Sequence, residues 1–216
     1  MHDDERASSG DQDAHGASGG IDPLAWEEAS AFRNAERERL YAERRALDGK
    51  ARQTISAQIA ENLESLLKLP DARTIALYWP IRGEPNLTGF MRKVHESGHR
   101  VVLPVVLEKR SPLAFHLWAP DAEMERGIWN IPVPRDTARA VPDIVIAPVV
   151  GFDDHGYRLG NGGGYYDRTL AGISADTLVI GVGYAFSRLP TIHPMPWDVP
   201  MDVMVLEDKI IDHRVD

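Results

Sequence analysis

The chemistry that this sequence could perform is concentrated in a loop with four glycines among five residues. The segment Arg158–Tyr165 reads Arg-Leu-Gly-Asn-Gly-Gly-Gly-Tyr and follows an apolar stretch, Ile144–Val150. Most of this loop lacks side chains, so several backbone N–H groups can converge on one anion. Arg158 adds a bidentate cation, and the helix predicted to begin near Tyr165 adds the positive end of its dipole. The pattern predicts a phosphate-binding loop.

This loop differs from the two common phosphate-binding motifs. A Walker loop ends in Gly-Lys followed by Ser or Thr, and that ending is absent. A dinucleotide-binding loop requires Gly or Ala where this sequence has Tyr165. A flexible surface turn is the alternative, but so many adjacent glycines carry a high entropic cost, which favours a binding role.

Three carboxylates are candidates for the same site, although each is a weak signal on its own. Asp167 falls in the first turn of the helix after the loop, where the dipole favours an acid in any case. Asp198 lies in the segment Trp197–Asp202, and oxygen ligands beside phosphates are what Mg²⁺ binds. Glu84 follows the predicted strand Thr74–Trp79, where α/β proteins place ligands, but a single loop glutamate is usually solvated.

Two sets of basic residues have helical spacing. Arg33, Arg37 and Arg44 fall within about 40° of one another on the first predicted helix. Acidic neighbours can neutralise them, and charge runs usually form solvated faces, so the pattern alone favours a solvated face. His95 and His99 have the spacing of a metal-binding pair, but no third ligand motif accompanies them, and we expect surface histidines.

The elements that must position these residues are predicted from apolar spacing and from Gly and Pro breaks. We expect helices at Leu24–Leu47, between Gly49 and Pro70, at Leu87–Glu96 and at Tyr165–Ala171. We expect strands at Thr74–Trp79, Val101–Val106, Leu113–Trp118, Ile144–Val150, Leu178–Val182 and Val203–Leu206. Near-continuous apolar strands indicate a sheet covered on both faces, and hence an α/β fold with a largely parallel core.

Composition narrows the class of protein further. The chain has 216 residues, of which 43% are hydrophobic, and this is the size of one α/β domain. The net charge of −9 argues against nucleic-acid binding, because affinity for phosphate backbones requires surplus Lys and Arg. Without cysteine there is no disulfide, thiolate nucleophile or Cys-zinc site. No apolar run is long enough to span a membrane and no secretory signal is seen, so we expect a cytoplasmic protein.

The first 22 residues differ from the rest of the chain. They hold six acids, one arginine and four glycines, with almost no large apolar residues. Such a segment cannot bury enough surface to offset the entropy lost on ordering. We therefore expect a disordered acidic tail over residues 1–22 and a single α/β domain over residues 23–216.

In combination, these segments resemble the 5-formyltetrahydrofolate cyclo-ligase family, also called 5,10-methenyltetrahydrofolate synthetases. The resemblance runs in order from about Ala31 to Leu206. Its most specific block is Arg-Leu-Gly-x-Gly-x-Gly-Tyr-Tyr-Asp at Arg158–Asp167. The other blocks are the basic first helix, Leu77–Pro80 followed by Glu84, Val102–Val106, Ile146–Pro148, Gly151–Gly156 and Trp197–Pro200.

The resemblance implies a fold and an activity. The fold is three-layer α/β, with a mostly parallel central sheet and helices on both faces (NagB/RpiA/CoA-transferase-like). The activity is ring closure of 5-formyltetrahydrofolate to 5,10-methenyltetrahydrofolate, with ATP as co-substrate and Mg²⁺ as the metal. The formyl oxygen is phosphorylated, N10 attacks the resulting imidate, and phosphate leaves. A monomer that acts on small molecules, without nucleic acid or membrane partners, is expected.

The resemblance also assigns roles to residues. Arg33 and Arg37 match the family's basic ATP contacts, Arg158 its phosphate-binding arginine, and Asp167 and Asp198 its metal ligands. Arg158 and Tyr165 are the candidate catalytic residues. The ATP loop comprises Gly160, Asn161, Gly162, Gly163, Gly164, Tyr165 and Tyr166. The folate contacts are Trp79 and Glu84, together with Asn161, Gly162, Gly163, Gly164 and Tyr165, which are shared with ATP.

Two other functions remain open at this stage. One is a nucleotide- or folate-binding regulatory module on the same fold that performs no turnover. The other is a phosphate-ester enzyme such as a sugar-phosphate isomerase, which fold analogy alone does not exclude. The presence of Arg158, both aspartates and Glu84 favours the cyclo-ligase, because a binding module has no need of all of them.

Overall fold

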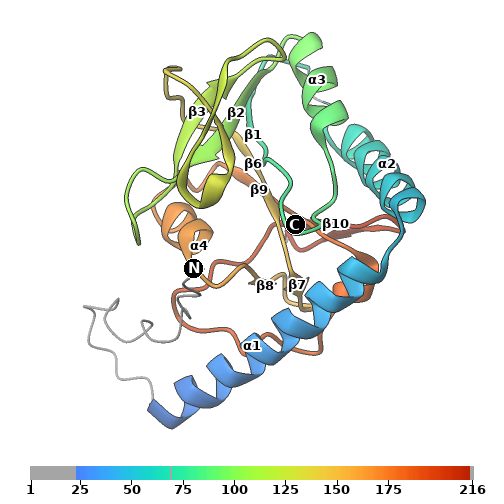
Figure 1. Cartoon of the computed structure of the whole chain (residues 1–216), viewed down its shortest axis with the longest axis vertical. Helices are drawn as coiled ribbons and strands as arrows, with labels where there is room; N and C mark the ends of the chain where they lie inside the picture. The colour runs from blue at the N-terminus through green and yellow to red at the C-terminus, as the bar shows by residue number, and fades with distance from the viewer. Residues whose placement is uncertain (1–22, 69, 215–216) are drawn as a thin grey trace, which may run out of the picture.

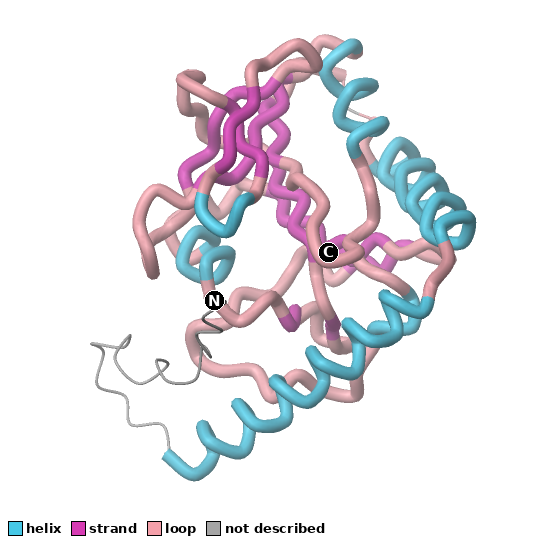
Figure 2. The backbone as a smooth tube through the Cα atoms, viewed as in Figure 1, coloured by secondary structure: helices cyan, strands magenta, loops and turns pink. Residues whose placement is uncertain are grey.

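The computed structural model describes residues 23–68 and 70–214, so the predicted tail over residues 1–22 lies outside the described residues. A seven-stranded sheet with the strand order β11-β10-β9-β6-β1-β2-β3 forms the centre of the molecule (Figure 1). Helices lie on both sides of this sheet (Figure 2). The predicted three-layer α/β fold with a mostly parallel sheet is confirmed.

All four predicted helices are present. They are α1 (Pro23–Ala46), α2 (Gly49–Leu66), α3 (Thr88–Glu96) and α4 (Tyr165–Leu170), with 3₁₀ turns at η1 (Ile128–Asn130) and η2 (Ala185–Ser187). Asp48 separates α1 from α2 and caps α2, because its side chain accepts a hydrogen bond of 2.7 Å from the Ala51 amide.

The six predicted strands all belong to the main sheet. They are β1 (Thr74–Ala76), β2 (Arg100–Val105), β3 (Ala114–Trp118), β6 (Ile144–Pro148), β9 (Leu178–Val182) and β10 (Val203–Val205). Five more strands were not predicted: β11 (Ile210–Asp212) at the sheet edge, the hairpin β4 (Met124–Arg126) with β5 (Pro132–Pro134), and the hairpin β7 (Gly151–Phe152) with β8 (Arg158–Leu159). The unpredicted strands have only two or three residues each, too few for an alternating pattern to emerge.

The order in which the chain adds strands to the sheet reverses between β1 and β6. Strands β10, β9, β6, β1 and β2 are parallel, and β3 and β11 pair antiparallel at the two edges. From β1 the chain proceeds to β2 on one side, and it later returns to β6 on the other side. The carboxyl ends of two such strands open a crevice in which α/β proteins bind ligands. The loop after β1 carries Glu84, and the chain after β6 leads through the β7–β8 hairpin to the glycine loop.

Two apolar cores cover the two faces of the sheet. On one face, α2 and α3 contribute residues such as Leu63 and Met91, which pack against strand residues including Ile75 and Ile146. On the other face, α4 contributes Leu170 to the second core. Successive strand residues point to opposite faces, so each strand supplies both cores.

The long helix α1 lies at the end of the sheet that holds the crevice. Leu40 of α1 forms a third apolar cluster with Val150, Leu159, Leu189 and Ile192. Figure 1 shows α1 crossing next to β7 and β8. This packing places one face of α1 directly against the chain that leads into the glycine loop. No helix among the described residues is long and apolar enough to cross a membrane.

Candidate active site

The glycine loop connects β8 to α4 and leaves its backbone open. Gly162 has φ 94° and Gly164 has φ 61°, in the left-handed region that favours glycine. Within the described part of the chain, the N–H groups of residues 160–164 donate to no protein acceptor. These amides are therefore available to an anionic ligand, and phosphate binding by the loop stays a prediction.

Arg158 lies under this loop with part of its hydrogen-bonding capacity unused. The residue is 6% exposed, and its guanidinium carbon lies 5.2 Å from the centre of the Tyr166 ring. Nη2 is 3.0 Å from Asp167 Oδ1, yet Nε and Nη2 have no aligned hydrogen-bond acceptor among the described residues. Buried N–H groups are rarely left unpaired, and those of a guanidinium match the oxygens of a phosphate.

The predicted row of three arginines on α1 faces inward, so the expectation of a solvated face is wrong for this row. Arg33 is buried, and it donates from Nε to the Ile192 carbonyl at 2.9 Å and from Nη2 to the His193 carbonyl at 2.7 Å. Arg37 donates from Nε to the Gly160 carbonyl at 2.8 Å. The chain around the glycine loop therefore supplies carbonyl acceptors to this face of α1, which a helical pattern cannot reveal.

Two of the acidic residues on α1 pair outside this row. Glu36 and Glu43 instead pair with the exposed Arg39. Arg44, in the same row as Arg33 and Arg37, is 1% exposed and donates to the Val149 carbonyl. The spacing of the three arginines was correctly recognised, but it marks a buried face.

The two aspartates predicted to bind metal are brought close together. Asp198 forms an ion pair with Arg33 and accepts a hydrogen bond of 2.6 Å from the Met195 amide. Asp167 faces Arg158 and accepts a bond of 3.4 Å from the amide of Val199, the residue next to Asp198.

These carboxylates fit Mg²⁺ as a partial ligand set. No group of three or more His, Cys, Asp or Glu side chains that could hold a metal occurs in the described regions. Mg²⁺ is commonly bound by one or two carboxylates, and phosphate oxygens and water complete its coordination. Asp167 and Asp198 beside a phosphate-binding loop supply that kind of set. His95 and His99 are no part of it.

Glu84 is buried, so the pattern-based expectation of a solvated glutamate is wrong. The residue is 7% exposed, and its carboxylate accepts bonds from the Ile81 amide at 3.0 Å and from Asn161 Nδ2 at 3.4 Å. A tight turn directs it inward: Arg82 and Gly83 both have positive φ, and the Glu84 amide donates to the Ile81 carbonyl at 2.9 Å, as in a type I′ turn.

Burial also changes the acidity of this carboxyl group. It raises the pKa of Glu84 from 4.5 to about 7, against the opposing effects of the Ile81 amide, the Arg44 charge and Asn161. Asn161 connects the loop to α1 as well, because its Oδ1 accepts a hydrogen bond from the Tyr41 hydroxyl. The structure therefore joins Glu84 to the glycine loop, although 77 residues separate Glu84 from Asn161.

The contacts that Tyr165 makes could not be predicted from the sequence. Its hydroxyl accepts a bond of 3.3 Å from the Arg110 amide in the β2–β3 loop, and Arg168 lies 5.2 Å from its ring centre. Trp129 of the β4–β5 hairpin meets this ring edge-on at 5.3 Å and is 60% exposed, with φ 55°. The positive φ of Trp129 could not be predicted from its residue type.

Trp79 is the candidate with the fewest described links to the others. It is partly buried, and it packs against the core beneath α2 and α3. Among the described residues, no hydrogen bond links its backbone to Glu84 or to the glycine loop. A role of Trp79 as a folate contact therefore stays a prediction.

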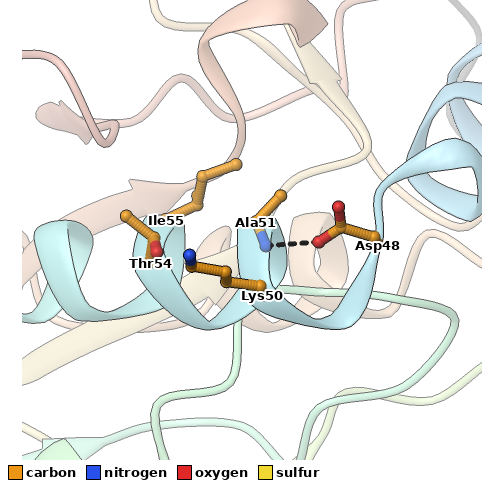
Figure 3. Close-up of a pocket in the computed structure, with 5 residues that line it drawn as sticks. All are labelled: Asp48, Lys50, Ala51, Thr54 and Ile55. Atoms are coloured by element: carbon orange, nitrogen blue, oxygen red, sulfur yellow. Dashed lines mark hydrogen bonds between the residues drawn. The ribbon is translucent and has the colours of Figure 1, made fainter.

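An open hollow at the start of α2 is unrelated to these residues (Figure 3). It is lined by Asp48, Lys50, Ala51, Thr54 and Ile55. Its acid is already engaged in capping α2. None of the candidate residues lines it.

Unused amides, inward-facing arginines and two aspartates at the reversal point of a parallel sheet define an α/β protein whose crevice offers donors suited to an anion. Residues 29–207 match the 5-formyltetrahydrofolate cyclo-ligase family, and the chain belongs to this family of ligases. The resemblance inferred from the sequence blocks is confirmed.

Individual relatives agree with this assignment. The 5-formyltetrahydrofolate cyclo-ligase of Escherichia coli K12 is 29% identical over 174 residues, covering 77% of this chain and 96% of the relative. That of Haemophilus influenzae is 30% identical over 155 residues, covering 68% and 83%. The NMR structure of 5,10-methenyltetrahydrofolate synthetase from Aquifex aeolicus superimposes with a TM-score of 0.75 at 30% identity, covering 86% of this chain and 94% of that one. The synthetase from Mycoplasma pneumoniae has a TM-score of 0.67 at 28% identity, covering 81% and 98%.

Proposed function

We propose that this protein catalyses the ATP- and Mg²⁺-dependent cyclisation of 5-formyltetrahydrofolate to 5,10-methenyltetrahydrofolate, releasing ADP and phosphate. The observation that carries this proposal is the buried Arg158 guanidinium, whose unused N–H groups lie beside the open glycine amides in a member of the cyclo-ligase family. We further propose that the protein acts on small molecules as a cytoplasmic monomer.

Binding of ATP is assigned to the basic side of the crevice. Arg158 and the amides of residues 160–164 would receive the phosphates, and Arg33 and Arg37 add positive charge from α1. Phosphoryl transfer depends mainly on positioning and on neutralising charge at the transferred group. Arginines and backbone amides do this without forming a covalent bond to the protein. The absence of cysteine therefore presents no difficulty for the proposed chemistry.

Binding of the folate is assigned to Glu84 and to the exposed side of the glycine loop. A reduced pterin presents several ring N–H donors, and a carboxylate can accept two of them side by side. Asn161, bonded to Glu84, lies between this carboxylate and the phosphate-binding amides. Tyr165 closes the opposite side of the loop.

The proposed reaction has two stages. The formyl oxygen attacks the γ-phosphorus of ATP, the bond to the bridging oxygen breaks, and ADP leaves. N10 then attacks the phosphorylated imidate carbon, its proton is lost, and phosphate departs with the former formyl oxygen to give the methenyl bridge. Arg158 would hold the transferred group during both stages, with Tyr165 beside the reacting formyl group.

Asp167 and Asp198 would hold Mg²⁺ against the phosphates. The ion supplies charge neutralisation at the transferred phosphoryl group. Both carboxylates face arginines, Asp167 with Arg158 and Asp198 with Arg33. These ion pairs fix the carboxylates at the edge of the loop where the phosphates are expected.

The direct test follows methenyl absorbance when protein, 5-formyltetrahydrofolate, ATP and Mg²⁺ are combined. The proposal requires a rise in absorbance that depends on each component, with one ADP formed per methenyl product. A non-hydrolysable ATP analogue should abolish the signal. Binding of ATP and folate without product would indicate a regulatory module instead.

We predict that Gly160→Ala weakens ATP binding while leaving the fold intact. A Cβ at this position would lie 2.7 Å from Arg158 Nη1, so the guanidinium must move away from its present position. The expected cost is about tenfold in ATP affinity, equivalent to one charge-assisted hydrogen bond. Calorimetric titration with Mg-ATP measures it. Gly172→Ala is the matched control, because its Cβ makes only an ordinary contact with the Thr169 carbonyl.

We predict that Asp167→Asn and Asp198→Asn raise the Mg²⁺ concentration needed for half-maximal activity. An amide is a weaker ligand for Mg²⁺ than a carboxylate, so an increase of about tenfold is expected at saturating ATP. Asp154→Asn is the control, because that exposed carboxylate pairs with Arg188 on the surface. If both variants keep the wild-type Mg²⁺ dependence, the metal is held by ATP alone.

A further inference from the structure

Arg44 is a fully buried cation that the proposed reaction does not use directly. Its Nη2 donates to the carbonyl of Val149 and, at 3.4 Å, to that of Val150, just beyond β6. Its guanidinium carbon lies 6.0 Å from the Tyr41 ring centre and 5.4 Å from that of Tyr184. Nε and Nη1 have no hydrogen-bond acceptor in the described part of the chain. Burying a charge in this way is costly unless an opposite charge compensates it.

The Arg44 side chain runs beneath the turn that presents Glu84. A Cβ on Gly83 would lie 3.6 Å from Arg44 Cβ, so the turn rests on the base of this side chain. The Gly83 carbonyl accepts a hydrogen bond of 2.7 Å from the Tyr184 hydroxyl, and the Tyr184 ring also borders the guanidinium. Arg44 therefore connects the turn after β1 to the chain after β6, which are the two sides of the crevice.

Glu84 is the carboxylate that compensates Arg44 electrostatically. The opposite charge of Glu84 raises the pKa of Arg44, although burial lowers it by more. The two side chains interact through space, and no direct ion pair joins them among the described residues. The attraction between the two charges still matters without direct contact, because both groups are buried and their surroundings have a low dielectric.

The charged or titratable groups around Glu84 must be considered together. They include Arg44 and Tyr41 from α1, Tyr78 just after β1, Arg82 in the same turn, Tyr166 in α4 and Tyr184 after β9. Tyr78, Tyr166 and Tyr184 remain neutral, because burial raises the pKa of each. Arg82 is exposed and lies over the Tyr41 ring. Arg44 is thus the buried cation of this set.

We propose that Arg44 is a positioning residue for the cyclisation, one that fixes the 81–84 turn and keeps the Glu84 carboxylate charged for the N–H donors of the pterin. This rests on the proposed role of Glu84 in folate binding. A protonated Glu84 would present a hydroxyl donor to ring N–H donors, and it could not accept from two of them. Arg44 therefore acts on the folate through Glu84 without touching it.

The main test measures kcat/KM for 5-formyltetrahydrofolate as a function of pH in Arg44→Met. Removing an opposite charge raises the pKa of a buried carboxyl, so the rising limb of the profile should move to higher pH by about one unit or more. The KM for ATP should stay unchanged. Arg44→Lys, which retains the charge, should move the limb back toward the wild-type position. Arg45→Met is the matched control, because Arg45 is the exposed neighbour on α1.

A second measurement needs no substrate and covers the case in which Arg44→Met folds poorly. Thermal unfolding is compared for wild type, Arg44→Met, Glu84→Gln and the double variant. Because Arg44→Met leaves a buried carboxylate without its partner, adding Glu84→Gln should restore part of the lost Tm above neutral pH.

The outcomes separate this inference from the proposed function. The role of Arg44 would be overturned if the rising limb of the kcat/KM profile does not move in folded Arg44→Met. Additive losses of Tm in the double variant would overturn it as well. A coupled Tm in a protein that forms no methenyl product would support the Arg44–Glu84 interaction and instead contradict the proposed activity. If Arg44→Lys and Arg44→Met shift the rising limb of the pH profile equally, the role of Arg44 is purely steric and the charge argument is rejected.

Discussion

Arg158→Ala is expected to weaken binding of Mg-ATP about 100-fold while the protein stays folded. Arg158 is the buried cation beneath the glycine amides, and its Nε and Nη2 have no aligned acceptor within the described residues. A bidentate contact with phosphate contributes about 3 kcal/mol when formed at a buried site, which corresponds to that loss of affinity. Calorimetric titration with Mg-ATP measures it directly.

Two control variants test whether the loss of ATP affinity is specific to the Arg158 guanidinium. Arg158→Lys keeps one charge but loses the planar fork, so it should recover little of the affinity. Arg188→Ala removes an exposed arginine that pairs with Asp154, and it should bind ATP as the wild type does. Unchanged ATP affinity in folded Arg158→Ala would remove this residue from the site. Loss of folate binding alone would place the phosphates elsewhere along the loop.

The fold could be predicted from local patterns because the segments that form its central strands are strongly apolar. Strands such as β9 and β6 have continuous buried residues, and Asp48-Gly49 separates two helices of very different composition. The elements that were missed are short strands in local hairpins, with too few residues each for an apolar pattern to show. The β7–β8 hairpin, for example, has two residues in each strand.

Only part of the site could be predicted from the sequence, and the physical reason is not the same for every residue. The glycine loop can be recognised because so many adjacent glycines carry an entropic cost that structure alone rarely requires. The arginines of α1 and Glu84 carry no such signal, because a charged residue is buried only if distant parts of the chain supply its partners. Arg33 finds carbonyls at Ile192 and His193, more than 150 residues away. Their roles came from family resemblance, not from spacing.

Trp79 shows how much depends on the resemblance alone. Its role as a folate contact was assigned by the family resemblance, five residues before Glu84. The turn at Arg82 and Gly83 directs Glu84 toward the glycine loop, and Trp79 packs on the core with α2 and α3. The role of Trp79 therefore stays a prediction, which folate binding by a Trp79 variant would test.

Glu84→Gln is expected to impair folate turnover without affecting ATP. The variant keeps the size of the side chain and an acceptor for the Ile81 amide, but it loses the second acceptor for pterin N–H groups. Leaving a donor unpaired costs about 1–3 kcal/mol, so kcat/KM for 5-formyltetrahydrofolate should fall about 10- to 100-fold. Affinity for ATP, measured by calorimetry, should match the wild type. Glu64→Gln, at an exposed surface pair with Lys93, is the matched control.

The pH dependence gives this prediction its second readout. Because the pKa of Glu84 is raised from 4.5 to about 7 in the folded protein, the native state binds more protons than the unfolded state between these values. The contribution of this group to stability is therefore present below pH 4.5 and is lost as the pH rises through about 7, by about 3 kcal/mol in all. Glu84→Gln lacks this loss.

Stability and activity should consequently change in opposite directions in this variant. At about pH 8 its Tm should equal or exceed that of the wild type, because no buried carboxylate has to be ionised. In the wild type, kcat/KM for the folate should rise as the pH passes through about 7, where Glu84 becomes charged, and Glu84→Gln should lack that rise. A variant with wild-type kcat/KM at low folate would show that the carboxylate does not receive the pterin. The phosphate-binding half of the site would then be unaffected, because Arg158 and the glycine amides are tested by ATP binding alone.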